Sequence, residues 1–76
     1  MGRRFELGSG NLNISVVSID EGWELWLCEG QRRVRLAATV SLDAFVEAGR
    51  EGKDLILLTV ERIRSEALAP RQRAAS

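Results

Sequence analysis

Apolar and polar positions alternate along the first half of the chain. Residues 12–19 (LNISVVSI) are rich in β-branched side chains, and residues 23–29 (WELWLCE) and 32–40 (RRVRLAATV) carry an apolar side chain at every second position, counted from Trp23 to Leu27 and from Val34 to Val40. A period of two is typical of strands that bury one face. Turn formers separate the three segments, with Asp-Glu-Gly at 20–22 and Gly-Gln at 30–31. The pattern predicts a three-stranded antiparallel meander.

The Gly-Gln pair suits a two-residue type II′ hairpin turn, in which glycine takes the first central position. Such a turn pairs Glu29 with Arg32. This pairing fixes the sheet face to which each remaining residue of both strands points. The expected inner pairs are Leu27–Val34, Leu25–Leu36 and Trp23–Ala38, and the expected outer pairs are Cys28–Arg33, Trp26–Arg35 and Glu24–Ala37. Trp23 is therefore predicted to point into the core and Trp26 away from it.

The register of the first strand stays open, because its apolar residues occur in both phases. A two-residue turn at Glu21-Gly22 would point Val17 and Ile19 to the outer face. A three-residue turn at 20–22 would instead point Ile14 and Val16 there. Either register leaves two β-branched aliphatic side chains near Trp26.

Helical spacing replaces alternation after residue 40. Ser41 is a good N-cap for a short helix with an apolar stripe of Leu42, Phe45 and Val46, which Gly49 and Gly52 would end. Asp54 would cap a second helix over 55–69, where apolar residues recur at helical intervals; a fourth strand over 55–60 is the alternative. The predicted core comprises Trp23, Leu25, Leu27, Val34, Leu36, Val40, Phe45, Ile56, Val60 and Ile63.

The order of elements predicts the fold class. Strands followed by helices are expected to form a two-layer α+β domain, βββαα, with both helices packed on one face of the sheet. We expect three parts: a flexible N-terminal leader over residues 1–11, a single α+β domain over 12–69, and a disordered C-terminal tail over 70–76. The tail follows Pro70 and shows no periodicity.

Composition argues against catalysis. The 76 residues include no histidine, no tyrosine and one cysteine, so zinc sites, Cys/His pairs and Ser-His-Asp triads are excluded within this sequence. Neither glycine-containing stretch has the spacing or the lysine of a phosphate-binding loop. We therefore expect no enzyme activity, no cofactor and no metal.

The chain has 45% hydrophobic residues, but no apolar run is longer than Leu55–Leu58, which is far short of the roughly 20 residues that span a bilayer. A cytoplasmic protein without a membrane partner is expected. Eleven basic and eleven acidic residues balance, which argues against a dedicated nucleic-acid binder.

Two stretches, VRLAATVSLDAF and ERIRSEA, resemble a family of small bacterial proteins of unknown function. That family looks like a short antiparallel sheet, a V-x-C-x-I-S-x-E-A-L stretch and a final helix ending in R-I-x-x-x-A. The matching positions are Leu36, Val40, Ser41, Asp43, Ala44 and Phe45 in the first stretch, and Arg62, Ile63 and Ala67 in the second. Ala38 and Val60 depart from the pattern. The resemblance implies a fold in which strands precede helices, and it gives no information about activity.

The outer sheet face is the candidate functional surface. Exposed apolar patches mark interaction sites, and Trp and Arg are enriched at binding hot spots. The residues predicted to contact a partner are Trp26, Arg33, Arg35, Glu24 and Cys28. In the alternative interpretation, Trp26 lies under Arg35 as an internal cation–π pair worth roughly 0.5–1 kcal/mol, or one of the chain's own termini covers it.

Two functions are compatible with this face. The first is a small non-enzymatic protein–protein interaction module, acting as a homodimer, an adaptor or a phage-type inhibitor, with a protein partner or a second copy on the face around Trp26. The alternative is a nucleic-acid-binding regulator, in which Arg32, Arg33 and Arg35 contact phosphates while Trp26 stacks on a base.

Overall fold

The chain folds as an antiparallel sheet followed by two helices. The computed structural model describes residues 3–8 and 10–67. The predicted α+β class is confirmed, with one strand more than expected. The elements are β1 (Arg3–Glu6), β2 (Leu12–Ile19), β3 (Gly22–Glu29), β4 (Arg32–Ser41), α1 (Leu42–Arg50) and α2 (Leu55–Ala67). The strands lie in the sheet in chain order, β1-β2-β3-β4.

The additional strand is β1, and the interpretation of residues 1–11 as a flexible leader was wrong for its residues. Phe5 pairs with Ile14 of β2, and Leu7, directly after the strand, is buried in the core. Gly8 and Gly10 adopt positive φ angles of 80° and 56°, so these glycines belong to the β1–β2 turn. Four residues with one apolar side chain are too few to show an alternating pattern. The tail predicted at 70–76 lies outside the described residues.

Residues 55–67 form one helix, so the alternative of a fourth strand over 55–60 is excluded. Ile56, Val60 and Ile63 lie at helical spacing and are buried against the sheet. Each such aliphatic side chain contributes about 1.5–3 kcal/mol when fully buried. Among the described residues, the buried members of the core are Leu7, Ile14, Val16, Leu25, Val40, Ile56, Val60 and Ile63.

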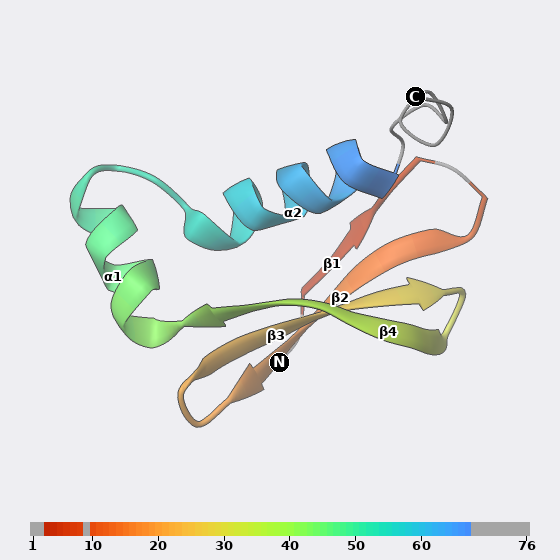
Figure 1. Cartoon of the computed structure of the whole chain (residues 1–76), viewed down its shortest axis with the longest axis horizontal. Coiled ribbons are helices and arrows are strands. Elements are labelled where there is room, and N and C mark those ends of the chain that lie inside the picture. Colours follow the sequence, from red (N-terminus) through yellow and green to blue (C-terminus); the bar gives the residue numbers. More distant parts are fainter. Residues whose placement is uncertain (1–2, 9, 68–76) are drawn as a thin grey trace, which may run out of the picture.

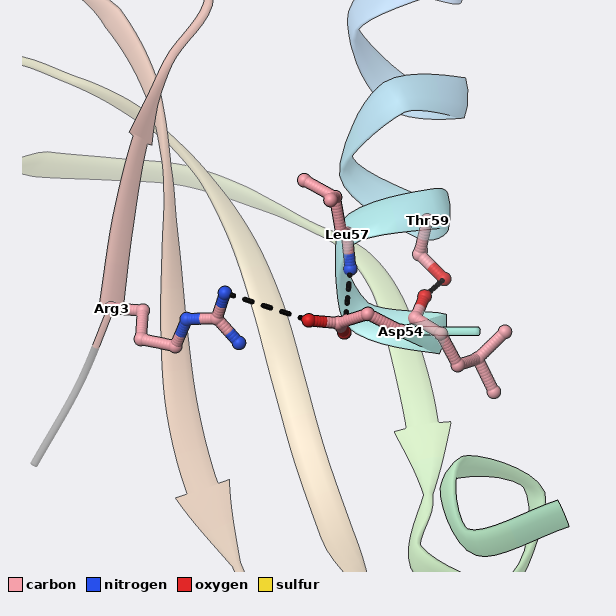
Figure 2. Close-up of polar contacts among 5 residues, drawn as sticks. Arg3, Asp54, Leu57 and Thr59 are labelled. Atoms are coloured by element: carbon pink, nitrogen blue, oxygen red, sulfur yellow. Dashed lines mark hydrogen bonds and ion pairs between the residues drawn. The ribbon is translucent and has the colours of Figure 1, made fainter. Parts of the chain in front are cut away.

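Both predicted N-caps are confirmed. The Ser41 hydroxyl accepts a hydrogen bond from the Ala44 amide at 3.1 Å, and the Asp54 carboxylate accepts one from the Leu57 amide at 3.1 Å. Asp54 also lies 3.8 Å from the Arg3 guanidinium, which links the start of α2 to β1 (Figure 2). One aspartate thus caps the helix and contacts the edge strand.

The end of α1 differs from the prediction, because Gly49 lies within the helix and Gly52 terminates it. Gly52 has a φ of 76°. Its amide donates to the Gly49 carbonyl at 3.0 Å, and the Lys53 amide donates to the Ala48 carbonyl at 2.9 Å. This bonding pattern is the Schellman motif, which requires a left-handed residue directly after the helix cap.

The β3–β4 hairpin begins in the predicted register and then departs from it. Glu29 pairs with Arg32, and Gly30 has the positive φ (64°) that a glycine-first turn needs. Beyond Cys28–Arg33 the pairing shifts twice, so that Leu27 lies opposite Arg35, Trp26 opposite Leu36, and Leu25 opposite Ala38. Each shift leaves one residue of β4, first Val34 and then Ala37, without an opposing residue, as in a β-bulge.

The two bulges remove two residues from the predicted core. Val34 is 50% exposed and Leu36 is 42% exposed, so placing them in the interior was wrong. The other predicted core residues are buried or pack against the core, namely Trp23, Leu25, Leu27, Val40, Phe45, Ile56, Val60 and Ile63. Sequence alternation misses a bulge, because each extra residue moves the remainder of the strand to the opposite face.

The β2–β3 connection settles the register of the first predicted strand. Ile19 pairs with Gly22 across a two-residue turn formed by Asp20 and Glu21, and Val17 pairs with Glu24. Ile14 and Val16 are therefore in the core, while Val17 and Ile19 point to the other face. The turn lies one residue earlier than Glu21-Gly22, and of the two registers that the sequence left open, the structure has the one with Val17 and Ile19 on the outer face.

The layers follow from this register. Figure 1 shows α2 along one side of the sheet beside β1, and α1 projecting from the end of β4. The buried side chains of α2 share one cluster with Ile14, Val16 and Leu25 of the sheet. Among the described residues, no helix covers the opposite side.

Candidate interaction surface

The sheet face turned away from α2, here called the open face, is built from rows of side chains that cross the strands. Residues that pair across antiparallel strands point to the same side. The register therefore assembles three rows: Arg33, Cys28, Asn13 and Glu6; Leu36, Trp26, Ser15 and Arg4; and Thr39, Glu24 and Val17. Trp26 lies in the middle row, beside Leu36 on one strand and Ser15 on the other.

Trp26 lies on the opposite face from Trp23, as predicted. Trp23 packs against the core and contacts Phe45, with ring centroids 4.7 Å apart. The Trp26 indole is half-buried, and its Nε1 donates a hydrogen bond to Glu24 Oε1 at 3.0 Å. Two residues of one strand thus supply an aromatic side chain to the core and another to the open face.

Arg33, and not Arg35, lies over the Trp26 ring. The guanidinium carbon of Arg33 is 5.0 Å from the ring centroid, within the range of a cation–π contact. The pairing of Trp26 with Arg35 was wrong, because the bulge at Val34 places Arg35 opposite Leu27. Four of the five predicted site residues, Trp26, Arg33, Glu24 and Cys28, therefore share the open face, and Arg35 does not join them by register.

Leu36 is the neighbour of Trp26 that sequence reasoning missed. It pairs directly with Trp26 and is 42% exposed. Val17 and the exposed Ile19 extend the apolar surface along β2. No signal in the sequence marked Leu36, because Val34, Leu36, Ala38 and Val40 alternate without interruption. The open face therefore has an apolar centre that depends on the bulges.

Cys28 belongs to the open face by register but is buried, with an exposed fraction of 3%. Its thiol donates to the Trp26 carbonyl oxygen at 3.7 Å. A sulfur so shielded packs as a small apolar side chain. Cys28 is therefore a packing residue of the open face, and its sulfur is not accessible to a partner.

Asn13, opposite Cys28, is the buried polar residue of this region. Its amide nitrogen donates to the carbonyl oxygens of Asn11 and Gly30, each at 3.1 Å, while the Gly30 amide donates to the Asn11 carbonyl at 2.9 Å. These bonds join the start of β2 to the β3–β4 turn. Asn13 therefore fixes the end of the hairpin that carries Arg33.

Charge on the open face is mixed. Arg4 and Arg33 contribute two positive charges, and Glu6 and Glu24 contribute two negative ones. Arg32, which flanks the face, is paired with Glu29 at 2.9 Å. The apolar centre is thus bordered by both signs, a pattern typical of protein surfaces that contact other proteins.

A polar cavity of about 200 Å³ lies at one end of the open face, between the β1–β2 and β3–β4 turns. Its lining includes Arg4, Glu6, Asn13 and Gly30. Within residues 3–8 and 10–67, no group of three or more acidic or cysteine side chains is arranged to hold a metal ion. No helix in the described part of the chain is long and apolar enough to cross a membrane.

Comparison with protein-family models, with curated proteins and with solved structures found no match to this chain. The resemblance to a bacterial family of unknown function stays a prediction.

Proposed function

We propose that this protein is a small, non-enzymatic protein–protein interaction module that binds a protein partner through the open face. The observation that carries the proposal is the arrangement around Trp26. A half-buried indole, held by Glu24 and Arg33, lies beside the exposed Leu36. A large aromatic side chain fixed in position and ringed by charged groups has the features of a binding hot spot.

Pre-organisation strengthens this proposal. The Nε1 hydrogen bond and the Arg33 contact restrain the Trp26 ring before any partner arrives. A partner that packs against the ring therefore loses less side-chain entropy on binding. Arg33 and Glu24 can also pair with charges at the rim of a partner, which favours correct orientation more than affinity.

The same arrangement favours a protein partner over a nucleic acid. Arg33 already occupies a face of the Trp26 ring, so a base could stack there only after that side chain moves. Among the described residues of the open face, Glu6 and Glu24 offset Arg4 and Arg33, which leaves no excess of positive charge there to attract phosphates. Nucleic-acid binding is the competing outcome of the test.

The test is affinity capture from a host lysate with the tagged full chain as bait, with and without nuclease. The proposal predicts that a partner is retained after nuclease treatment and through a wash from about 50 to 200 mM salt. Binding that depends on 6–10 phosphate contacts would fall about 10³–10⁵-fold over that range. If nuclease treatment abolishes retention of the partner, the result would contradict the proposal and favour a nucleic-acid-binding regulator.

Two matched pairs of variants locate the contact. Trp26→Ala should release the partner, whereas Leu58→Ala, at an exposed leucine on α2, should retain it. Arg33→Ala should weaken capture, while Arg35→Ala, at a residue displaced by the bulge, should not. Equal loss in Arg35→Ala and Arg33→Ala would show that general positive charge, and not the Trp26 site, holds the partner.

A further inference from the structure

Helix α1 is amphipathic but buries none of its side chains completely. Phe45 turns inward to Trp23, while Leu42 and Val46 are 48% and 46% exposed. Isolated helices shorter than about 12–15 residues are marginal in water, and α1 has nine residues. Two large aliphatic side chains on so short a helix favour a further contact that covers them.

The exposed side of α1 has a shape suited to a second helix. Leu42, Val46 and Gly49 lie at i, i+4 and i+7, so they form one stripe along the helix. A Cβ built at Gly49 meets no atom within 4 Å, so the backbone is open to close approach there. Figure 1 shows α1 projecting at one end of the molecule, away from β1.

Charge along α1 favours a second copy of the same helix, running antiparallel. Asp43 lies in the first turn and Arg50 in the last, seven positions apart on one flank of the stripe. A pairing centred between positions 46 and 47 sets Asp43 of one helix beside Arg50 of the other, twice over. It also places the two helix dipoles antiparallel, so that each positive end lies beside a negative end. A chain of zero net charge does not repel its copy at long range.

The surroundings of Asp43 strengthen this complementarity. A groove of about 380 Å³ next to the start of α1 is lined by Glu21, Ser41, Leu42 and Asp43. Two carboxylates thus border a recess at the position where the antiparallel arrangement brings Arg50 of the second copy. Arg50 of the same chain is 3.6 Å from Glu47, and both side chains are largely exposed, so the guanidinium is accessible to a second copy.

We propose that α1 is the contact through which two copies of this chain form an antiparallel, twofold-symmetric dimer. Leu42, Val46 and Gly49 form its apolar centre, and two Asp43–Arg50 pairs form its flank. Each copy uses the same surface, as twofold symmetry requires. This contact is separate from the open face, so its failure would leave the proposed function unaffected.

The test is the dissociation constant of the full chain, from sedimentation equilibrium over a range of protein concentrations. Val46→Asp should raise it at least about tenfold, because a carboxylate would lose water at the centre of the contact. Leu58→Asp, at a leucine 49% exposed on α2, should leave it within about twofold. A wild-type chain that stays monomeric, or a dimer broken by Leu58→Asp and not by Val46→Asp, would overturn the proposal.

A charge exchange tests the geometry without relying on Val46. Asp43→Arg and Arg50→Asp should each raise the dissociation constant several-fold, and the double variant should return it close to the wild-type value. Circular dichroism of each variant shows whether α1 remains folded. A double variant as weak as the single variants, or a dimer lost in Trp26→Ala, would overturn the antiparallel α1 contact.

Discussion

Asn13 shows how one polar side chain holds the open face in shape. It is buried, yet its amide nitrogen satisfies two backbone carbonyl oxygens that belong to two different turns. A buried donor with two acceptors contributes more through the penalty for its removal than through its net hydrogen-bond energy. The residue therefore specifies where the β3–β4 hairpin ends, and with it the position of Arg33.

Asn13→Asp tests this role with almost no change of shape. The substitution replaces the donor by a carboxylate oxygen that faces two carbonyl oxygens, and it buries a charge. We expect the free energy of unfolding to fall by about 3 kcal/mol, measured by urea denaturation. Asn11→Asp, at an exposed neighbour, should change it by less than about 0.5 kcal/mol. Equal stability of the two variants would contradict the role given to Asn13.

At the scale of elements, the sequence predicts most of the fold, since periodicity and capping residues are local signals. The three long strands, both helices and both N-caps follow from spacing and from Ser41 and Asp54. β1 could not be predicted, because its pairing with β2 depends on tertiary contacts of Phe5 and Leu7. The four residues of the strand are too few to show a pattern that indicates those contacts. The bulges escape prediction because Val34, Leu36, Ala38 and Val40 alternate without interruption, so the sequence does not mark the extra residues.

The site was predictable only as far as the register was. Trp26, Glu24 and Arg33 are near the Gly30 turn or share its strand, so alternation placed them on one face. Arg35 and Leu36 lie beyond the first bulge, and both were assigned to the opposite face from the one that the structure gives them. The apolar centre of the surface was therefore missed, although its indole was found.

Helix α1 should be the least stable element of the described fold. Its main link to the core is Phe45 on Trp23, whereas α2 buries Ile56, Val60 and Ile63. Segments with few buried contacts open locally at low free energy. We expect Phe45→Ala to speed amide hydrogen exchange across α1 at least about tenfold, with α2 little changed, when measured at low protein concentration.

Leu58→Ala is the control for this measurement, since it truncates an exposed leucine on the other helix. It should leave exchange in α1 unaltered. Exchange in α1 as slow as in α2, both before and after Phe45→Ala, would mean that α1 is held by contacts other than Phe45.

In the whole molecule, the core, the exposed stripe of α1 and the open face occupy different parts of the fold. Side chains of α2 and one sheet face form the core, α1 projects with an exposed apolar stripe, and the open face carries Trp26. Because the proposed dimer contact and the proposed partner contact lie on different elements, a chain paired with a second copy would still present its open face. Two copies would then present two such faces, which increases avidity for a partner with two binding sites.

The proposed role of Trp26 in binding is tested most directly by calorimetric titration of the protein that affinity capture retains. Trp26→Ala should raise the dissociation constant about 30-fold or more, which is the loss of affinity expected when a hot-spot tryptophan is removed. Leu58→Ala should match the wild-type chain within about twofold. A Trp26→Ala chain that is folded and binds its partner as tightly as the wild type would contradict a role of Trp26 in binding.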